Sequence, residues 1–127
     1  MRKKFYPKLT MKFPAVVTSD EGIRLKVTGL EVSTEGLTVQ CSTAERNLIT
    51  PGGSFIHNGR PLELDLQIDF ATSSNQENFV FARCHVIFSR RITKNTCQIG
   101  LVFLEISDEN HGQIKQMIEA SSIASAA

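Results

Sequence analysis

The amino-acid sequence predicts an all-β domain, a six-stranded antiparallel β-barrel, followed by one C-terminal helix. Apolar and polar residues alternate in several short runs, which is the period of a β-strand with one buried face. Clusters of Gly, Pro, Asn and Ser separate these runs and predict turns. Helical spacing occurs only after residue 107, so strands do not alternate with helices, and this excludes a doubly wound parallel sheet.

The first part of the chain contains a strand and a hairpin. Residues 13–17 predict a short first strand. Residues 23–28 and 37–41 alternate on either side of a turn at 33–36, and this pattern predicts a β-hairpin. Gly29 follows the first arm of the hairpin and indicates a bulge or a bend.

The second part contains three strands after an irregular segment. Residues 42–61 carry Pro-Gly-Gly and Asn-Gly turn signals and are expected to be irregular. Residues 62–70 alternate without error and predict the clearest strand, and 71–78 form a polar connection. Residues 80–88 and 97–103 predict the last two strands. The side chains expected to face the core from these two are Val80, Ala82, Cys84, Val86, Phe88, Cys97, Ile99, Leu101 and Phe103.

The C-terminal segment predicts a helix. Ser107 suits a helix N-cap, and acidic residues follow it at the positive end of the helix dipole. Ile114, Met117 and Ile118 recur at helical spacing and are expected to cover an opening or flank of the barrel. The expected organisation is a basic N-terminal arm, a barrel with its helix, and a frayed tail, at residues 1–12, 13–120 and 121–127.

Composition indicates one globular domain that needs no disulfide or metal staple, because 127 residues can bury an ordinary core. The three cysteines form no CxxC pair and lie in apolar alternating runs, so we expect free, buried thiols. No run approaches the roughly 18 apolar residues of a spanning helix, and no signal peptide is recognisable. We therefore expect a cytoplasmic location without membrane insertion.

The N-terminal arm is basic. Five of the 14 basic residues lie within residues 1–12, and the same segment holds no acid. A solvated tail is the favoured explanation of such a charge run, and an anion-binding arm is the alternative if the rest of the chain supplies a ligand site.

No catalytic constellation is recognisable. The three histidines show no ligand spacing, and the sequence contains no nucleophile elbow, P-loop or GxGxxG motif. Glu63, Asp65 and Asp69 share one strand face and are candidates for holding a cation, although a solvated outer face is the favoured interpretation. We therefore expect no enzyme, no catalytic residue and no metal ligand, and a binding role is favoured.

Two short segments resemble the signatures of a known family. Lys4 and Lys8 form a KxxxK pair before the first strand. Glu31, Ser33 and Gly36 form an ExSxxG turn in the first hairpin. These segments resemble, in the same order, the RxxxR arm and the (D/N)xSxxG turn of the PilZ domain family. The last strands and the terminal helix also fit the family pattern, so the resemblance covers most of the chain.

The resemblance implies a barrel that binds cyclic di-GMP, a bacterial second messenger with two phosphates and two guanines. Lys4 and Lys8 would hold phosphate or guanine. Glu31 and Ser33 would meet the guanine edge, and Gly36 would let the turn approach the ligand with a positive φ. Lysine keeps the charge of the family's arginines but lacks the planar fork that pairs bidentately and stacks on a base. We therefore expect weak binding.

Two functional readings follow from the resemblance. The first is a regulatory module that binds cyclic di-GMP weakly and signals to an unidentified protein partner. The alternative is an adaptor of the same fold that does not bind the nucleotide and acts by protein contacts in motility, pilus assembly or secretion. An oligonucleotide-binding barrel is less favoured because its helix usually lies between strands, so no DNA or RNA partner is expected.

The strand at 79–88 carries apolar residues on its outer face. Phe79, Phe81 and Ile87 alternate with the residues expected in the core. Such residues need cover, which the terminal helix or a second subunit in a dimer would supply.

Overall fold

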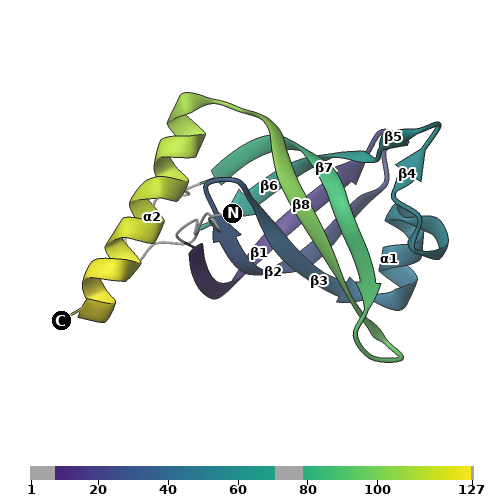
Figure 1. The fold of residues 1–127 in the computed structure, drawn as a ribbon, viewed down its shortest axis with the longest axis horizontal. Coiled ribbons are helices and arrows are strands. Elements are labelled where there is room, and N and C mark those ends of the chain that lie inside the picture. The colour runs from purple at the N-terminus through teal and green to yellow at the C-terminus, as the bar shows by residue number, and fades with distance from the viewer. Residues whose placement is uncertain (1–7, 71–78, 127) are drawn as a thin grey trace, which may run out of the picture.

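The computed structural model describes residues 8–70 and 79–126, with side chains up to residue 121. Six antiparallel strands close into a barrel in the order β1-β2-β3-β8-β7-β6, with β6 returning to β1 (Figure 1). The strands are β1 (Lys8–Ser19), β2 (Arg24–Ser33), β3 (Gly36–Ser42), β6 (Glu63–Asp69), β7 (Phe79–Arg91) and β8 (Thr96–Ile106). The barrel confirms the fold class that the alternating runs predict.

The two ends of the barrel carry helices. Helix α2 (Asp108–Ala126) lies across one end, and α1 (Thr43–Ile49) lies at the other (Figure 1). Beside α1 are the 3-10 turn η1 (Pro51–Gly53) and a small hairpin of β4 (Ile56–His57) and β5 (Arg60–Pro61). No described helix has the length and apolar character needed to span a bilayer.

Helix α1 corrects the expectation that residues 42–61 are irregular. The Ser42 hydroxyl accepts the backbone N–H of Glu45 at 3.1 Å, and the Glu45 carboxylate accepts the N–H of Ser42 at 2.9 Å. This reciprocal capping box satisfies two backbone donors at the start of the helix. The Ser-x-x-Glu pattern of the capping box is present in the sequence. The turn signals that follow it led to the whole segment being predicted as irregular.

Element boundaries at both ends of the chain differ from the sequence expectation. Strand β1 starts at Lys8, before the expected segment 13–17, so part of the basic arm belongs to the barrel wall. Helix α2 continues to Ala126, through the segment expected to be a frayed tail. The expected polar connection at 71–78 lies outside the described residues.

The core fills the barrel and extends under both helices. Along β6, Leu64, Leu66 and Ile68 are at most 2% exposed, as strict alternation requires. Ile114 and Ile118 of α2 are buried in the same cluster, with Met117 packed partly against it. The predicted anchoring face of the terminal helix is therefore confirmed.

A bulge at Leu30 confirms the irregularity that Gly29 indicates. The pairing of β2 with β3 passes from Gly29–Val39 to Glu31–Thr38, so Leu30 is an extra residue. A β-carbon at Gly29 would collide with the aromatic ring of Phe13. Gly29 therefore leaves room for a core aromatic, and the bulge turns Glu31 outward.

A second bulge overturns the placement of Phe88 in the core. Val86 pairs with Leu101 and Phe88 pairs with Gly100, so Ile87 is extra. The slip reverses the alternation of β7, because a one-residue shift exchanges the two faces of a strand. The Phe88 ring lies over Gly100, where any β-carbon would collide with it. Ser89 turns inward instead, and its hydroxyl lies 2.9 Å from that of buried Thr50.

The three cysteines are free and buried, as the sequence predicts. Burial raises the pKa of the Cys41 thiol to about 11 and that of Cys84 to about 12. A desolvated thiolate is disfavoured, so these thiols act as small apolar core groups.

Two glycine substitutions test the packing with opposite expected signs. Gly112→Ala adds a methyl to the interior of α2 where nothing lies within 4 Å, so we expect about 0.5–1 kcal/mol of added stability. Gly29→Ala drives a methyl into the Phe13 ring, so we expect a loss of about 1–3 kcal/mol. Urea denaturation measures both. Wild-type stability of Gly29→Ala would contradict the described contact.

Candidate ligand-binding site

Four of the five predicted ligand residues surround one hollow on the outer wall of the barrel. Lys8 begins β1, Glu31 and Ser33 lie near the end of β2, and Gly36 begins β3. The hollow has a volume of about 280 Å³. The fifth predicted residue, Lys4, lies outside the described residues. The folded chain thus joins the described parts of both sequence motifs.

The floor of the hollow is one row of residues across four strands. Glu31 of β2 pairs with Thr38 of β3, Thr38 pairs with Gly100 of β8, and Gly100 pairs with Phe88 of β7. Gly100 has no side chain, and the Phe88 ring lies over it. All four residues line the hollow. It therefore has a charged end at Glu31 and an aromatic end at Phe88.

An ion pair occupies the charged end. The Lys8 ammonium lies 3.1 Å from the Glu31 carboxylate, and the Thr38 hydroxyl donates to the same carboxylate at 3.4 Å. The side chains of Lys8 and Glu31 are 58% and 37% exposed, so water and salt screen the pair. Exposed pairs of this kind contribute about 0.2–1 kcal/mol. A ligand group of matching charge can therefore compete for either partner at modest cost.

The turn beside the ion pair is closed by its own serine. The Ser33 hydroxyl accepts the backbone N–H groups of Glu35 at 3.1 Å and of Gly36 at 3.3 Å. The turn also touches α2, because Nε2 of His111 lies 3.1 Å from the Thr34 carbonyl oxygen. The hydroxyl of Ser33 therefore shapes the turn as well as lining the hollow.

Gly36 is needed for a different reason from the one expected. The described glycines with a positive φ are Gly22, Gly52, Gly53 and Gly59, so Gly36 does not have the predicted left-handed conformation. A β-carbon at Gly36 would instead collide with the backbone carbonyl of Leu101 on β8. Glycine at this position lets β3 and β8 approach closely at the edge of the hollow.

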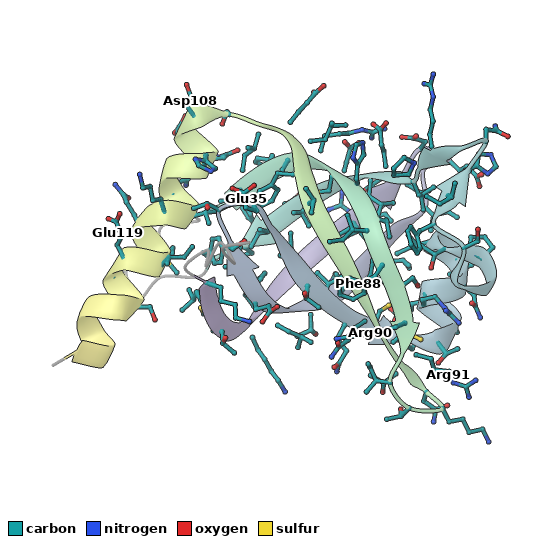
Figure 2. The ribbon with its side chains drawn as sticks, in the orientation of Figure 1. Glu35, Phe88, Arg90, Arg91, Asp108 and Glu119 are labelled. Atoms are coloured by element: carbon teal, nitrogen blue, oxygen red, sulfur yellow. The ribbon has the colours of Figure 1, made fainter. Side chains whose placement is uncertain are left out.

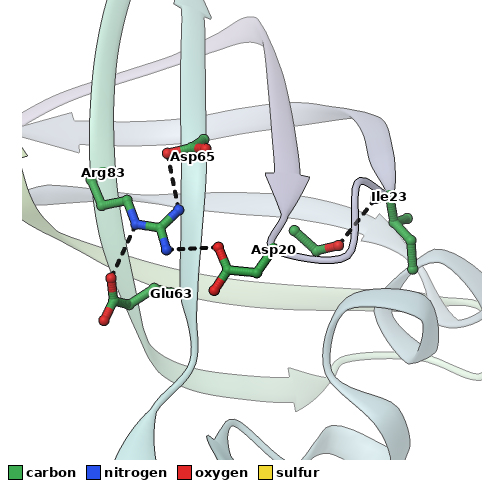
Figure 3. A network of polar contacts seen from close by, with 6 residues as sticks. Asp20, Ile23, Glu63, Asp65 and Arg83 are labelled. Atoms are coloured by element: carbon green, nitrogen blue, oxygen red, sulfur yellow. Dashed lines mark hydrogen bonds and ion pairs between the residues drawn. The ribbon is translucent and has the colours of Figure 1, made fainter.

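A separate polar cluster accounts for two of the three carboxylates considered for a cation. The Arg83 guanidinium binds Asp20 at 2.7 Å, Glu63 at 3.0 Å and Asp65 at 3.1 Å (Figure 3). The bonds to Asp20 and Asp65 raise the pKa of Arg83 further above its ordinary value. In the described part of the chain, no three His, Cys, Asp or Glu side chains gather as a metal site would require. The cluster ties the β1–β2 turn to β6 and β7.

Sequence reasoning missed Thr38, Phe88 and Gly100 as parts of the site. A glycine inside an otherwise apolar strand indicates that another group approaches closely. Gly100 is such a glycine and could have been recognised from the sequence. Phe88 carried no such signal, because a run of three apolar residues does not reveal which of them is a bulge.

The model of the PilZ domain family matches residues 2–120. The chain belongs to the PilZ family. The match covers nearly all of the chain, and it decides against the oligonucleotide-binding barrel that the basic arm left open. Comparison with curated proteins gives no match.

Solved PilZ structures share the fold of this chain. The inhibitor of motility MotI (DgrA) of Bacillus subtilis aligns with a TM-score of 0.74 and 13% identity over 98% of this chain. The chain spans 53% of that protein's length. The PilZ domain of YcgR from Escherichia coli, solved with cyclic di-GMP, gives a TM-score of 0.64 and 11% identity over 99% of this chain and 100% of the domain.

A third similar structure is PlzA of Borreliella burgdorferi in complex with cyclic di-GMP. It has a TM-score of 0.56 and 8% identity, and the alignment covers 94% of this chain and 51% of PlzA. At such low identities the similarity establishes the PilZ fold.

Replacing Ser33 tests the structure of the turn. Ser33→Ala removes the acceptor of two backbone donors, and we expect a loss of about 1 kcal/mol in urea denaturation. Ser33→Thr keeps the hydroxyl and serves as the control. Equal stability of Ser33→Ala and wild type would show that the hydroxyl does not support the turn.

Proposed function

We propose that this PilZ domain is a regulatory module that binds cyclic di-GMP weakly and signals to a protein partner. The observation that carries the proposal is the meeting of Lys8, Glu31, Ser33 and Gly36 around one hollow. Two similar PilZ structures, those of YcgR and PlzA, were solved with this nucleotide, which supports the choice of ligand.

The chemistry of the charged end suits a guanine nucleotide. The N1–H and N2–H groups of guanine are adjacent donors, and the Glu31 carboxylate offers two acceptor oxygens. The Lys8 ammonium is a donor for phosphate oxygen once the nucleotide displaces it from Glu31. Lys4, in the arm, would add a second cation.

Two features favour weak binding. The ligand must first replace the ion pair between Lys8 and Glu31. The hollow, at about 280 Å³, is just below the range of roughly 300–1,000 Å³ usual for small-molecule sites, so part of a cyclic dinucleotide would lie exposed on the barrel wall.

The contact between the turn and α2 offers a route for signalling. A ligand that alters the turn at 33–36 changes the surroundings of the Thr34 carbonyl, which His111 of α2 contacts. Helix α2 is packed on the barrel through Ile114 and Ile118, so a small displacement of its start would move the surface presented to a partner.

The ion pair also favours the alternative function, an adaptor that does not bind the nucleotide. Lys8 and Glu31 already neutralise each other, so the site needs no ligand to balance its charges. On the same reading, Phe81, which is 55% exposed on β7, is a contact for a partner or for a second copy in a dimer. Helix α2 does not cover Phe81, although its Asn110 side chain accepts the Phe81 backbone N–H at 3.0 Å.

Restoring the family pattern tests the proposal. The triple variant Lys4→Arg, Lys8→Arg and Glu31→Asp should bind cyclic di-GMP about tenfold or more tightly than wild type in calorimetric titration. An arginine fork holds two acceptors in one plane, and charge-assisted hydrogen bonds contribute roughly 1.5–3 kcal/mol each. Lys8→Ala should weaken wild-type binding and flatten its salt dependence. The linear dinucleotide is the control ligand.

The adaptor function predicts a different result. Undetectable binding at millimolar nucleotide by both the wild type and the triple variant, with circular dichroism showing intact folds, would defeat the receptor proposal.

A further inference from the structure

The aromatic end of the hollow is built by residues outside both family motifs. The bulge at Ile87 turns Phe88 out of the core, and Gly100 leaves space for its ring on the barrel wall. Phe88 lines the same hollow as Lys8 and Glu31. A large apolar ring is thus placed at the opposite end of the hollow from the charged pair.

Arg90 rests on that ring. Its guanidinium carbon lies 4.9 Å from the centroid of the Phe88 ring, and its Nη2 donates to the Gln98 side chain at 3.0 Å. Both contacts hold the guanidinium against the Phe88 ring, which itself lines the hollow. Figure 2 shows Phe88 and Arg90 following one another along β7, with Arg91 nearer the hairpin tip. The pair forms a flat, cationic shelf.

We propose that Phe88 and Arg90 form a base-stacking shelf for the second base of the nucleotide. The inference rests on the proposed function and assigns the half of the ligand that the charged end does not reach. The backbones of Glu31 and Phe88 are three strand spacings apart, roughly 14 Å along the row, and the Phe88 ring reaches back over Gly100. A ligand with two bases can place one at each end.

The shelf supplies what the lysine arm lacks. The two lysines of the arm carry charge but no stacking plane. Arg90 offers the flat face of its guanidinium, and the Phe88 ring supports that guanidinium from below. A base packed on such a surface gains affinity whatever its identity, because every base has a π-face. The shelf therefore sets affinity, whereas Glu31 selects guanine.

The chain provides matched controls for both residues of the shelf. Phe81 lies on the same strand and is 55% exposed, but it lines a different part of the surface. Arg91 is exposed and adjacent to Arg90, and its Nε donates to the Thr93 carbonyl. Phe81→Leu and Arg91→Lys thus repeat the chemical changes away from the hollow.

Calorimetric titration with cyclic di-GMP tests the shelf. Phe88→Leu should weaken binding about tenfold or more, as loss of base stacking does, while Phe88→Tyr and Phe81→Leu should stay within about twofold of wild type. Arg90→Lys should also weaken binding, with an unchanged slope against salt because the charge is kept. Arg91→Lys should leave both affinity and slope unchanged. If Phe88→Leu fails to fold, Arg90→Lys still tests the proposal.

The outcomes separate this inference from the proposed function. If wild type binds and the Phe88 and Arg90 variants bind equally well, the shelf is wrong and the receptor function stands. If wild-type binding is too weak to measure, the same variants are made in the triple variant with restored arginines. If that protein also fails to bind, the receptor function and the shelf both fall.

Discussion

The uninterrupted ladder between β3 and β8 forms the middle of the candidate site, between the charged and the aromatic ends. Its seven pairs run from Gly36–Val102 to Ser42–Thr96 without a register shift. The ladder holds the turn at 33–36 over one end of the barrel and places Thr38 opposite Gly100. Gly36 makes the ladder possible, because a β-carbon there would collide with the Leu101 carbonyl, and Gly100 leaves room beside the ladder for the Phe88 ring of β7.

A bulge in each of the strands on either side of this ladder, β2 and β7, determines which side chains face the outer wall of the barrel. The extra residue in β2 turns Glu31 outward, and the extra residue in β7 turns Phe88 outward. Regular strands would bury apolar groups and expose polar ones along their whole length. The two bulges instead place a carboxylate and an aromatic ring at opposite ends of one hollow, where a ligand with polar edges and flat faces can meet both.

The sequence predicts the parts of the structure that follow from periodicity. Strict alternation along β6 and the helical spacing of Ile114 and Ile118 place these residues in the core without ambiguity. The outward turn of Phe88 could not be predicted, because the cause is a one-residue slip inside a continuous apolar run. The motif residues Glu31 and Gly36 could be located by spacing, but the close approach of β8 that explains Gly36 depends on a partner over sixty residues away.

The most direct test of the account is an NMR titration of uniformly ¹⁵N-labelled protein with cyclic di-GMP. Binding across the barrel wall predicts that amide signals of Glu31, Thr38 and Gly100 shift together, with one dissociation constant, and that α2 near His111 follows. Helix α1 and the β4–β5 hairpin, beside the other end of the barrel, should not shift. Spectra that stay unchanged at millimolar nucleotide, or shifts confined to the α1 end, would contradict the account.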